Sequence, residues 1–265
     1  MLTNSDINFY KENGYIVAKQ VINPKYFEEL FETSVNLLKN YGKSLVKSNT
    51  EFKSWEDESF HKKMIELRTK LPENFSAVYQ AVQKGCSIAN LTCHKKILNQ
   101  VSLLLKERPE NLSHTISVLR MDAPNDEKNW FGFHQDSAYF DYPEYVKNIN
   151  GENNITCWIP MTAVNTKRGA VRLCAKSHKG GFLHNHEKLP TIKPISDEVA
   201  SKYDIVDVEL EAGDAIFFHG ATIHCSGHNT SSLIRFAFVT RYYRMLADDF
   251  YLHPDVKEKI TGVNG

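Results

Sequence analysis

Apolar residues recur at helical spacing in the early part of the chain. Thr3 or Ser5 can cap a first helix that ends at Gly14, and YIVAKQVI at 15–22 is typical of a short strand. The segment NPKYFEELFETSVNLLKNYG then places its apolar side chains on one helical face. Residues 56–106 predict two or three further helices, with KGCSIANL as a break and HKKILNQVSLLL as the last helix.

From residue 114 the period shortens, and aromatic and β-branched runs alternate with turn signals. The predicted strands lie in TISVLRM, FGFHQDSAYF, ITCWIPMTAV, GAVRLCAK, YDIVDVEL, DAIFFHGATIH and LIRFAFVTRYY. The turn signals between them are APND, NTKRG, EAGD and CSGHNTSS. Many short strands at this spacing favour a sandwich or barrel of the jelly-roll type.

One domain accounts for this order of elements, because no internal repeat or low-complexity linker divides the chain. We expect a mainly β fold with N-terminal helices: a helical layer over 1–110, a jelly-roll core over 111–245 and a C-terminal tail over 246–265. Residues 183–202 are polar and contain proline, so this segment is expected to form a long loop or lid.

The composition points to a small-molecule partner. The 265 residues are 42% hydrophobic and 24% charged, and Lys plus Arg equals Asp plus Glu at 32 each. A neutral chain lacks the basic footprint of a nucleic-acid binder, and no apolar run is long enough to span a bilayer. The opening MLTNSDINFYKENGY lacks the apolar core of a signal peptide, so a cytoplasmic location is expected. Five cysteines without a CxxC spacing are expected to be free, with Cys157 and Cys174 in the core.

Two ionisable residues, His134 and Asp136, lie in the aromatic run FGFHQDSAYF, which is predicted to be a strand. Residues two apart on a strand point to the same face, so the imidazole and the carboxylate would aim at one point. A metal at that point needs at least one further ligand. His224 is the candidate because it ends the run DAIFFHGATIH just before a turn, whereas His219 within the run is expected to be a core histidine.

Arg235 is the second feature of this region. If LIRFAFVTRYY returns as the hairpin partner of the preceding run, Arg235 lies close to His224. A buried guanidinium needs an anionic partner, and the carboxylate of a bound ligand would supply one. Two histidines, one carboxylate and open coordination positions form the facial triad of non-heme Fe(II) oxygenases. A bidentate 2-oxo acid can then take two of the open positions and O2 the third.

The motif HQD at 134–136, with FFHGATIHCSGHN at 217–229 and then Arg235, resembles the phytanoyl-CoA dioxygenase family. The stretches LTNSDINFYKENGYIVAKQVI and CWIPMTAVNTKRGAVRLCAKSHKGG are also similar to that family, so the resemblance covers most of the chain. It implies an Fe(II)- and 2-oxoglutarate-dependent oxygenase on a double-stranded β-helix. Departures are Ala175 and Lys176 in place of Pro-Gly, and His228 where proline is common.

The resemblance also implies roles for individual residues. The implied iron ligands are His134, Asp136 and His224, and the implied anchor for the 5-carboxylate of 2-oxoglutarate is Arg235. Positions that line the cosubstrate or substrate pocket are matched by Ser226, Gln135 and Trp158. Ser226 could equally be a turn residue and Trp158 a core aromatic. The presence of Asp136 favours hydroxylation of an unactivated C–H bond over halogenation, with release of succinate and CO2.

Two other readings remain open. A non-catalytic jelly-roll module could bind a ligand or keep the metal site as a structural staple, and a zinc site could serve hydrolysis. Neither gives Arg235 a role. The basic cluster Lys167, Arg168, Arg172, Lys176 and Lys179 is compatible with an anionic substrate such as a CoA ester, and equally with a solvated turn.

Overall fold

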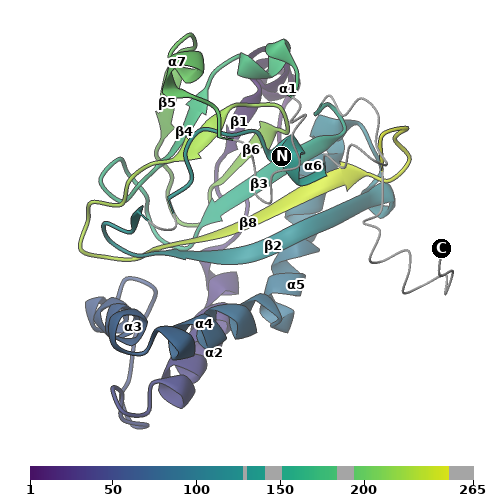
Figure 1. Cartoon of the computed structure of the whole chain (residues 1–265). Coiled ribbons are helices and arrows are strands. Elements are labelled where there is room, and N and C mark those ends of the chain that lie inside the picture. Colours follow the sequence, from purple (N-terminus) through teal and green to yellow (C-terminus); the bar gives the residue numbers. More distant parts are fainter. Residues whose placement is uncertain (128–129, 141–150, 184–193, 251–265) are drawn as a thin grey trace, which may run out of the picture.

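The computed structural model describes residues 1–127, 130–140, 151–183 and 194–250, which form two antiparallel sheets and a helical layer (Figure 1). The helices are α1 (Asn4–Asn13), α2 (Glu28–Tyr41), α3 (Glu58–Lys70), α4 (Pro72–Gln83), α5 (Cys86–Thr92), α6 (Lys95–Leu105) and α7 (Asp197–Ala200). The strands are β1 (Tyr15–Ala18), β2 (Leu112–Asp122), β3 (Asn154–Pro160), β4 (Val171–Cys174), β5 (Ile205–Val208), β6 (Ala215–His219), β7 (His224–Ser226) and β8 (Arg235–Arg244). Short 3-10 turns are η1 (Pro24–Phe27), η2 (Pro109–Asn111), η4 (Asp136–Phe140) and η5 (Ser177–Gly180).

The first helix begins and ends as its sequence predicts. The Thr3 hydroxyl accepts the Asp6 amide and the Asp6 carboxylate accepts the Thr3 amide, so the two residues form a capping box. Gly14 ends the helix at φ +80°, a conformation that favours glycine. The expected break KGCSIANL is wrong, because Gly85 caps a new helix, α5, directly after α4. Four helices therefore lie between residues 58 and 105, where two or three were expected.

The strands are arranged in two sheets, with orders β1-β6-β3-β8-β2 and β5-β4-β7. Two expectations about them are wrong. The run DAIFFHGATIH is not one strand but is split into β6 and β7, which belong to different sheets. For the same reason β7 and β8 do not form a hairpin. The expectation of a mainly β chain is also corrected, since the described residues form a mixed structure in which helices outweigh strands.

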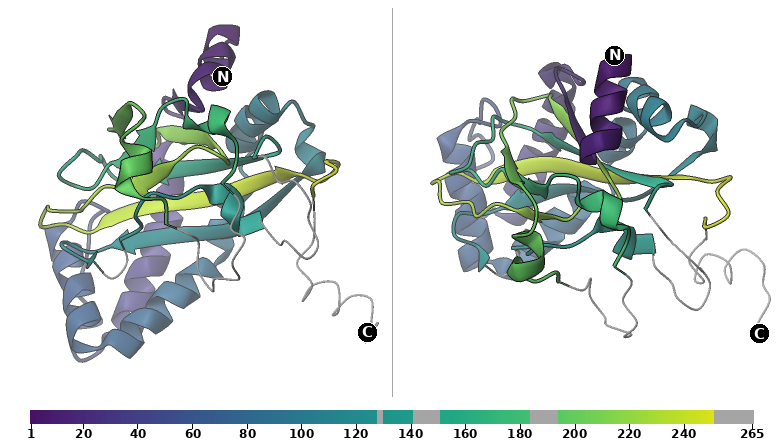
Figure 2. Two further views of the ribbon diagram at one scale, coloured as in Figure 1. Left: turned by 45° about the horizontal axis from the view of Figure 1, so that its top comes forward. Right: turned by 90° about the horizontal axis from the view of Figure 1, so that it is seen from above.

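The larger sheet has an outer face on the helices and an inner face toward the smaller sheet. Helices α2 to α5 lie on one side of it, and β4 and β5 on the other (Figures 1 and 2). Strand β8 shows the division by its alternation. Phe236, Phe238 and Tyr242 join the core shared with the helices. Ala237 and Val239 join the core between the sheets.

Strand β2 lies at the edge of the larger sheet, and helix α4 covers part of that edge. The side-chain amide of Gln83 donates to the carbonyl of Leu119 at 3.0 Å and accepts its N–H at 2.7 Å. A glutamine thus takes the place of a neighbouring strand at this point, which protects the sheet edge from pairing with another chain.

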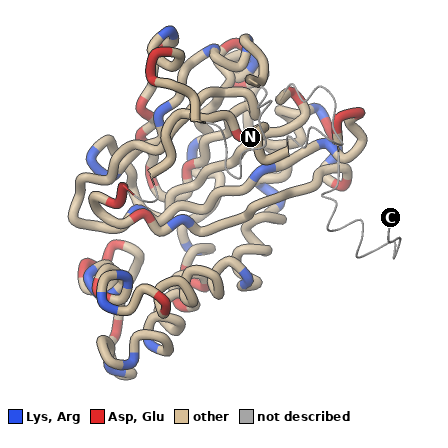
Figure 3. Tube along the Cα trace, in the orientation of Figure 1, with Lys and Arg blue, Asp and Glu red and all other residues tan. Residues whose placement is uncertain are grey.

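Charges of both signs are spread over the described surface (Figure 3). Lysine and arginine are interspersed with aspartate and glutamate over the described trace, on helices and sheets alike (Figure 3). No helix among the described residues has the length and apolar character needed to cross a membrane. All five cysteines are free, and Cys157 and Cys174 are buried as expected. The predicted loop at 183–202 contains α7, and its residues 184–193 lie outside the described part, as do residues 251–265 of the predicted tail.

A buried histidine joins the helical layer to the large sheet, and its replacement is expected to destabilise the fold. His61 Nε2 lies 2.7 Å from the Trp55 carbonyl, and its Nδ1 accepts the Ile234 N–H at 3.0 Å. In His61→Leu both backbone groups lose their partner, at an expected loss of about 1–3 kcal/mol for each in the free energy of unfolding. Urea denaturation measures this loss, and the exposed His114→Leu serves as the control.

The same variant should change the pH dependence of stability. Burial lowers the pKa of His61 below 6.5, so the unfolded chain takes up its proton more readily than the folded chain. The stability contributed by the neutral ring is therefore complete above pH 6.5 and is lost as the pH falls through the folded-state pKa. A pH slope that is as steep in His61→Leu as in the wild type would contradict this assignment.

Candidate metal centre

The run FGFHQDSAYF is not the strand that its aromatic residues predicted. Within it an isolated β-bridge joins His134 to His224, which exchange N–H···O=C hydrogen bonds of 2.9 and 3.0 Å. Asp136 then begins the 3-10 turn η4. The pairing sets His134 beside the first residue of β7, and the turn directs the carboxylate toward both rings. The three side chains therefore converge because of the β-bridge between the histidines and the turn η4, not because residues alternate along a strand.

Three buried donors converge at this point. His134, Asp136 and His224 each offer one ligand atom, and these atoms lie within 4.8 Å of one another. Asp136 Oδ1 lies 3.5 Å from His134 Nε2 and 3.7 Å from His224 Nε2. The exposed fractions are 7%, 1% and 6% in chain order, so the cluster is largely withdrawn from bulk water. Two imidazoles and one carboxylate are a donor set suited to ferrous iron.

Both histidines have the same tautomer imposed on them. His134 Nδ1 lies 2.7 Å from the Gly132 carbonyl, and His224 Nδ1 lies 2.9 Å from the Thr222 carbonyl. A carbonyl only accepts, so each Nδ1 carries a proton, and in the neutral ring the Nε2 that faces the common point has the lone pair. Such backbone contacts fix ring orientation in metal sites.

The second carboxylate oxygen of Asp136 is already bound by the protein. Thr156 Oγ1 donates to Oδ2 at 2.6 Å, and Arg241 Nε lies 2.9 Å from the same atom. Arg241 Nη2 also donates to Oδ1 at 3.1 Å, and its guanidinium lies 3.9 Å over the ring of Tyr139. The arrangement leaves Oδ1 as the oxygen that faces the histidines.

The charges of the cluster suit metal binding. Burial by itself would raise the pKa of Asp136, but Arg241 and the two histidines hold it well below its usual value. Burial and the neighbouring His134 lower the pKa of His224 to about 3. At neutral pH Asp136 is therefore ionised and His224 is neutral, the states in which both act as ligands.

The sequence suggested that Arg235 has no anionic partner within the protein, but the structure gives it one. Its Nε and Nη2 donate to Asp122 Oδ2 at 3.2 and 2.8 Å, across the pair of strands β2 and β8. Its Nη1 donates to the carbonyls of Gly169 and Gly227. The anionic partner that this guanidinium requires is thus a protein carboxylate, and the residue is only 2% exposed.

Three further predicted pocket residues have different surroundings. The amide of Gln135 donates to the carbonyls of Gly181 and Ala221 and accepts the N–H of Leu183. These three contacts are with loops of the protein itself. Trp158 lies in the core between the sheets, paired with Val239 of β8.

Ser226 ends β7 next to Gly227, and its backbone N–H donates to the carbonyl of Phe131. Its own carbonyl accepts the indole N–H of Trp130 at 2.7 Å. The position beside Gly227 puts Ser226 close to the Arg235 guanidinium. Its role as a pocket residue stays a prediction.

The basic cluster is largely paired within the protein. Arg168 contacts Glu56, Arg172 contacts Asp207, and Lys176 and Lys179 both contact Glu12. The solvated-turn reading therefore has the better support. His219 packs against Tyr10 and His178, as expected for a histidine without a ligand role.

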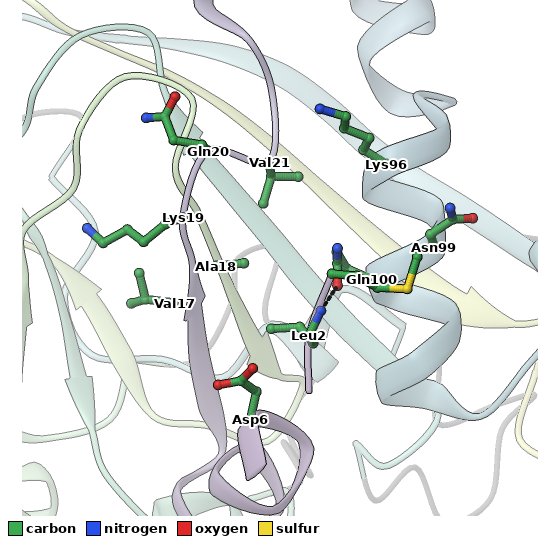
Figure 4. A pocket seen from close by; sticks show the side chains of 11 residues that line it. Leu2, Asp6, Val17, Ala18, Lys19, Gln20, Val21, Lys96, Asn99 and Gln100 are labelled. Carbon is green, nitrogen blue, oxygen red and sulfur yellow. Dashed lines mark hydrogen bonds between the residues drawn. The ribbon is translucent and has the colours of Figure 1, made fainter. Parts of the chain in front are cut away.

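A cavity of about 430 Å³ lies apart from the three donors. It is formed where the open edge of β1 faces helix α6, and Figure 4 shows the Leu2 N–H bound to the side-chain carbonyl of Gln100 within it. None of the converging donors lines this cavity.

Three residues of the centre were missed by the sequence reasoning, namely Thr156, Arg241 and Asp122. A signal for Arg241 was present, because it lies six positions after Arg235 and so on the same face of the strand. Asp122 lies two positions after Arg120 at the end of a predicted strand, so the two charged residues share one face of that strand. This spacing could also have been detected. Thr156 in an apolar run carried no such signal.

Known proteins resemble the chain in sequence and fold. A probable phytanoyl-CoA dioxygenase of Caenorhabditis elegans is 25% identical over 260 residues, which cover 91% of this chain and 75% of that protein. The iron/alpha-ketoglutarate-dependent dioxygenase ausO of Aspergillus calidoustus is 27% identical over 115 residues, covering 43% of this chain and 35% of ausO.

Solved structures share the fold at low identity. The epimerase SnoN in complex with Fe3+, alpha ketoglutarate and nogalamycin RO has a TM-score of 0.60 at 18% identity, over 90% of this chain and 82% of SnoN. The alpha ketoglutarate dependent carbocyclase SnoK has a TM-score of 0.58 at 20% identity, over 94% of this chain and 88% of SnoK.

The expectation of iron and 2-oxoglutarate agrees with these relatives and with the three converging donors. The family assignment rests on a broader match, since a sequence profile named phytanoyl-CoA dioxygenase (PhyH) covers residues 10–237. That range includes all three donors and Arg235. The chain therefore belongs to the phytanoyl-CoA dioxygenase family.

Proposed function

We propose that the protein is an Fe(II)- and 2-oxoglutarate-dependent dioxygenase that hydroxylates an unactivated C–H bond of a small molecule. One observation carries the proposal: the buried side chains of His134, Asp136 and His224 converge. The carboxylate is ionised, and the backbone carbonyls hold both rings with a proton on Nδ1. The family match supports the reaction class.

The proposed iron ligands are the Nε2 atoms of His134 and His224 and Oδ1 of Asp136. Bound there with 2-oxoglutarate, iron supplies the activation of O2 that oxidises the substrate, with release of succinate and CO2. Thr156 and Arg241 hold Asp136 Oδ2 and so present a single carboxylate oxygen. The burial of the donors limits the access of water to the centre.

The finer architecture belongs to this proposal. We infer that the sheets β1-β6-β3-β8-β2 and β5-β4-β7 are the two halves of a double-stranded β-helix, with the candidate iron site at the seam between them. The division into a helical layer over 1–110, a core over 111–245 and a tail over 246–265 stays a prediction. A cytoplasmic location likewise rests on the sequence alone.

Hydroxylation is proposed over other oxidative outcomes. The neighbouring folds include an epimerase and a carbocyclase, so this architecture accommodates several fates of an oxidised substrate. With iron bound, the carboxylate of Asp136 would occupy the position that a halide needs, which disfavours halogenation. A substrate screen that follows product mass and succinate together separates hydroxylation from epimerisation and ring closure.

Removal of one imidazole should abolish both metal binding and 2-oxoglutarate turnover. We expect anaerobic Fe(II) plus 2-oxoglutarate to give the wild type a weak visible charge-transfer band, because a bidentate 2-oxo acid binds iron directly. His224→Ala should give no band, since it leaves two protein ligands. The control is the exposed His114→Ala, which should retain the band. A band of wild-type strength in His224→Ala would exclude this residue as a ligand.

Loss of the hydroxyl that holds Asp136 should weaken the metal without removing a ligand. Thr156→Val keeps the shape of a side chain that is 1% exposed but leaves Oδ2 without its 2.6 Å hydrogen bond. Residues of this kind typically contribute 10–100-fold to metal affinity, so we expect about a tenfold weaker Kd for Mn(II) by calorimetry. Thr156→Ser should recover most of the affinity.

The half-buried Thr33→Val, whose hydroxyl donates to the helix carbonyl of Glu29, is the matched control. An unchanged Kd in Thr156→Val would show that Arg241 alone fixes the orientation of the carboxylate.

A further inference from the structure

The aromatic rings that pack against the two donor histidines differ in their exposure to solvent. Phe218 lies against His224, with ring centroids 4.4 Å apart, and is 2% exposed. Phe131 lies against His134, with ring centroids 5.8 Å apart, and is 40% exposed. The apolar border of the candidate metal centre is therefore closed at Phe218 and open to solvent at Phe131. A substrate that approaches along this open border meets the ring of Phe131.

The ring of Phe131 is held in place although it is exposed. The guanidinium of Arg120 lies 5.1 Å from the ring centroid, which is a cation–π contact. The charge of Arg120 is balanced by Asp122, whose carboxylate accepts its Nε and Nη2 hydrogens. The backbone is fixed as well, because the Phe131 carbonyl accepts the N–H of Ser226. The exposed part of this residue is thus an ordered apolar ring.

The neighbouring Trp130 is also exposed, at 39%, and also fixed. Its indole N–H donates to the Ser226 carbonyl at 2.7 Å, and its ring stacks on His228 with centroids 4.6 Å apart and planes at 12°. A Cβ on Gly132 would lie 3.4 Å from the far edge of the indole. Gly132 comes two residues before one donor histidine, and Ser226 comes two residues after the other. The indole therefore contacts both chain segments that carry the donor imidazoles.

Two ordered and exposed aromatic rings at this place need an explanation. A single exposed apolar residue is common, but these two are consecutive and border the candidate metal centre. A purely structural role, as a clamp between the two segments, accounts for the hydrogen bond of Trp130 but not for the exposed ring of Phe131. Aromatic side chains that are already fixed bind a ligand at a low cost in conformational entropy. Their faces and edges also favour other aromatic rings beyond the area that is buried.

We propose that Phe131 and Trp130 form the substrate-recognition surface of the candidate metal centre, and that they bind a planar apolar ring system of the substrate. This inference rests on the proposed function and names the class of its substrate. Arg120 supports the ring of Phe131 and His228 supports the ring of Trp130, so both surfaces are set before the substrate arrives. A substrate ring on Phe131 lies beside His134 and is thereby brought to the metal.

The first test compares two ligands that share one carbon skeleton. Coumarin is a planar aromatic lactone, whereas octahydrocoumarin is the puckered saturated lactone with the same skeleton. Their Kd values for the metal-free protein, from NMR titrations of each ligand, give a ratio that isolates the contribution of planarity. We expect the wild type to bind coumarin about three- to tenfold more tightly, the effect of one or two aromatic contacts.

Phe131→Leu and Trp130→Leu should each lower this preference to about twofold or less, because leucine keeps apolar volume but offers no ring. Phe131→Tyr keeps the ring and should retain the wild-type preference. Phe9→Leu is the matched control, since Phe9 on α1 is 42% exposed and also contacts one other ring, that of Tyr15. Thermal denaturation confirms that each variant is folded.

A second test measures how close the bound ligand lies to the metal centre. Mn(II) is paramagnetic and broadens the NMR signals of protons near it, whereas Zn(II) does not. We expect the coumarin signals to broaden strongly with the Mn(II) protein and to stay sharp with the Zn(II) protein. The Phe131→Leu variant should show at least threefold less broadening at the same coumarin concentration.

The outcomes separate this inference from the proposed function. Equal binding of both lactones by the wild type, or an equal loss of preference in Phe9→Leu, would overturn the recognition surface. A retained preference in Trp130→Leu together with weaker Mn(II) binding would make Trp130 a structural clamp and remove it from the surface. Coumarin that binds the Mn(II) protein without broadening would show that the surface does not lead to the metal. A wild type that fails to bind Mn(II) would overturn the proposed function, whatever the lactones show.

Discussion

The candidate iron site depends on the ion pair between Asp136 and Arg241. A carboxylate that is 1% exposed remains charged only where other groups replace the hydration it has lost. Arg241 and Thr156 do so at Oδ2, and they come from β8 and β3, two adjacent central strands of the larger sheet. The charge that would draw a metal to this point is therefore set by the sheet before any metal binds. The histidines need only supply neutral nitrogen, which their backbone carbonyl contacts already orient.

Strand β8 connects the layers of the molecule. Its outer face, with Phe236 and Phe238, anchors the helical layer, and its inner face begins with Arg235 and reaches Arg241. Small and branched residues between the two arginines leave the inner face apolar there. The two guanidinium groups differ in their partners. Arg241 pairs with Asp136 beside the two histidines, and Arg235 pairs with Asp122 on β2.

Local rules predicted much of this arrangement from the sequence. The cap at Thr3, the end of α1 at Gly14 and the inner and outer alternation of β8 follow from residue preference and period. The set of two histidines, an aspartate and an arginine could be found because their side chains are rare in apolar runs. The strand through His134, the hairpin before Arg235 and the expected lack of a protein partner for Arg235 were wrong for one reason. Each depends on which strands become neighbours, and a single sequence does not encode this in any short stretch.

The position of the donors has a mechanical consequence. His224 belongs to the sheet β5-β4-β7, whereas the carboxylate of Asp136 is fastened to β3 and β8 of the other sheet. A metal ion bound by both residues would cross-link the two sheets. Without the ion, the two sheets would separate locally more often, and the amide hydrogens of β7 would exchange faster with solvent than in the metal-bound protein. A metal bound at this position would therefore also stabilise the contact between the two sheets.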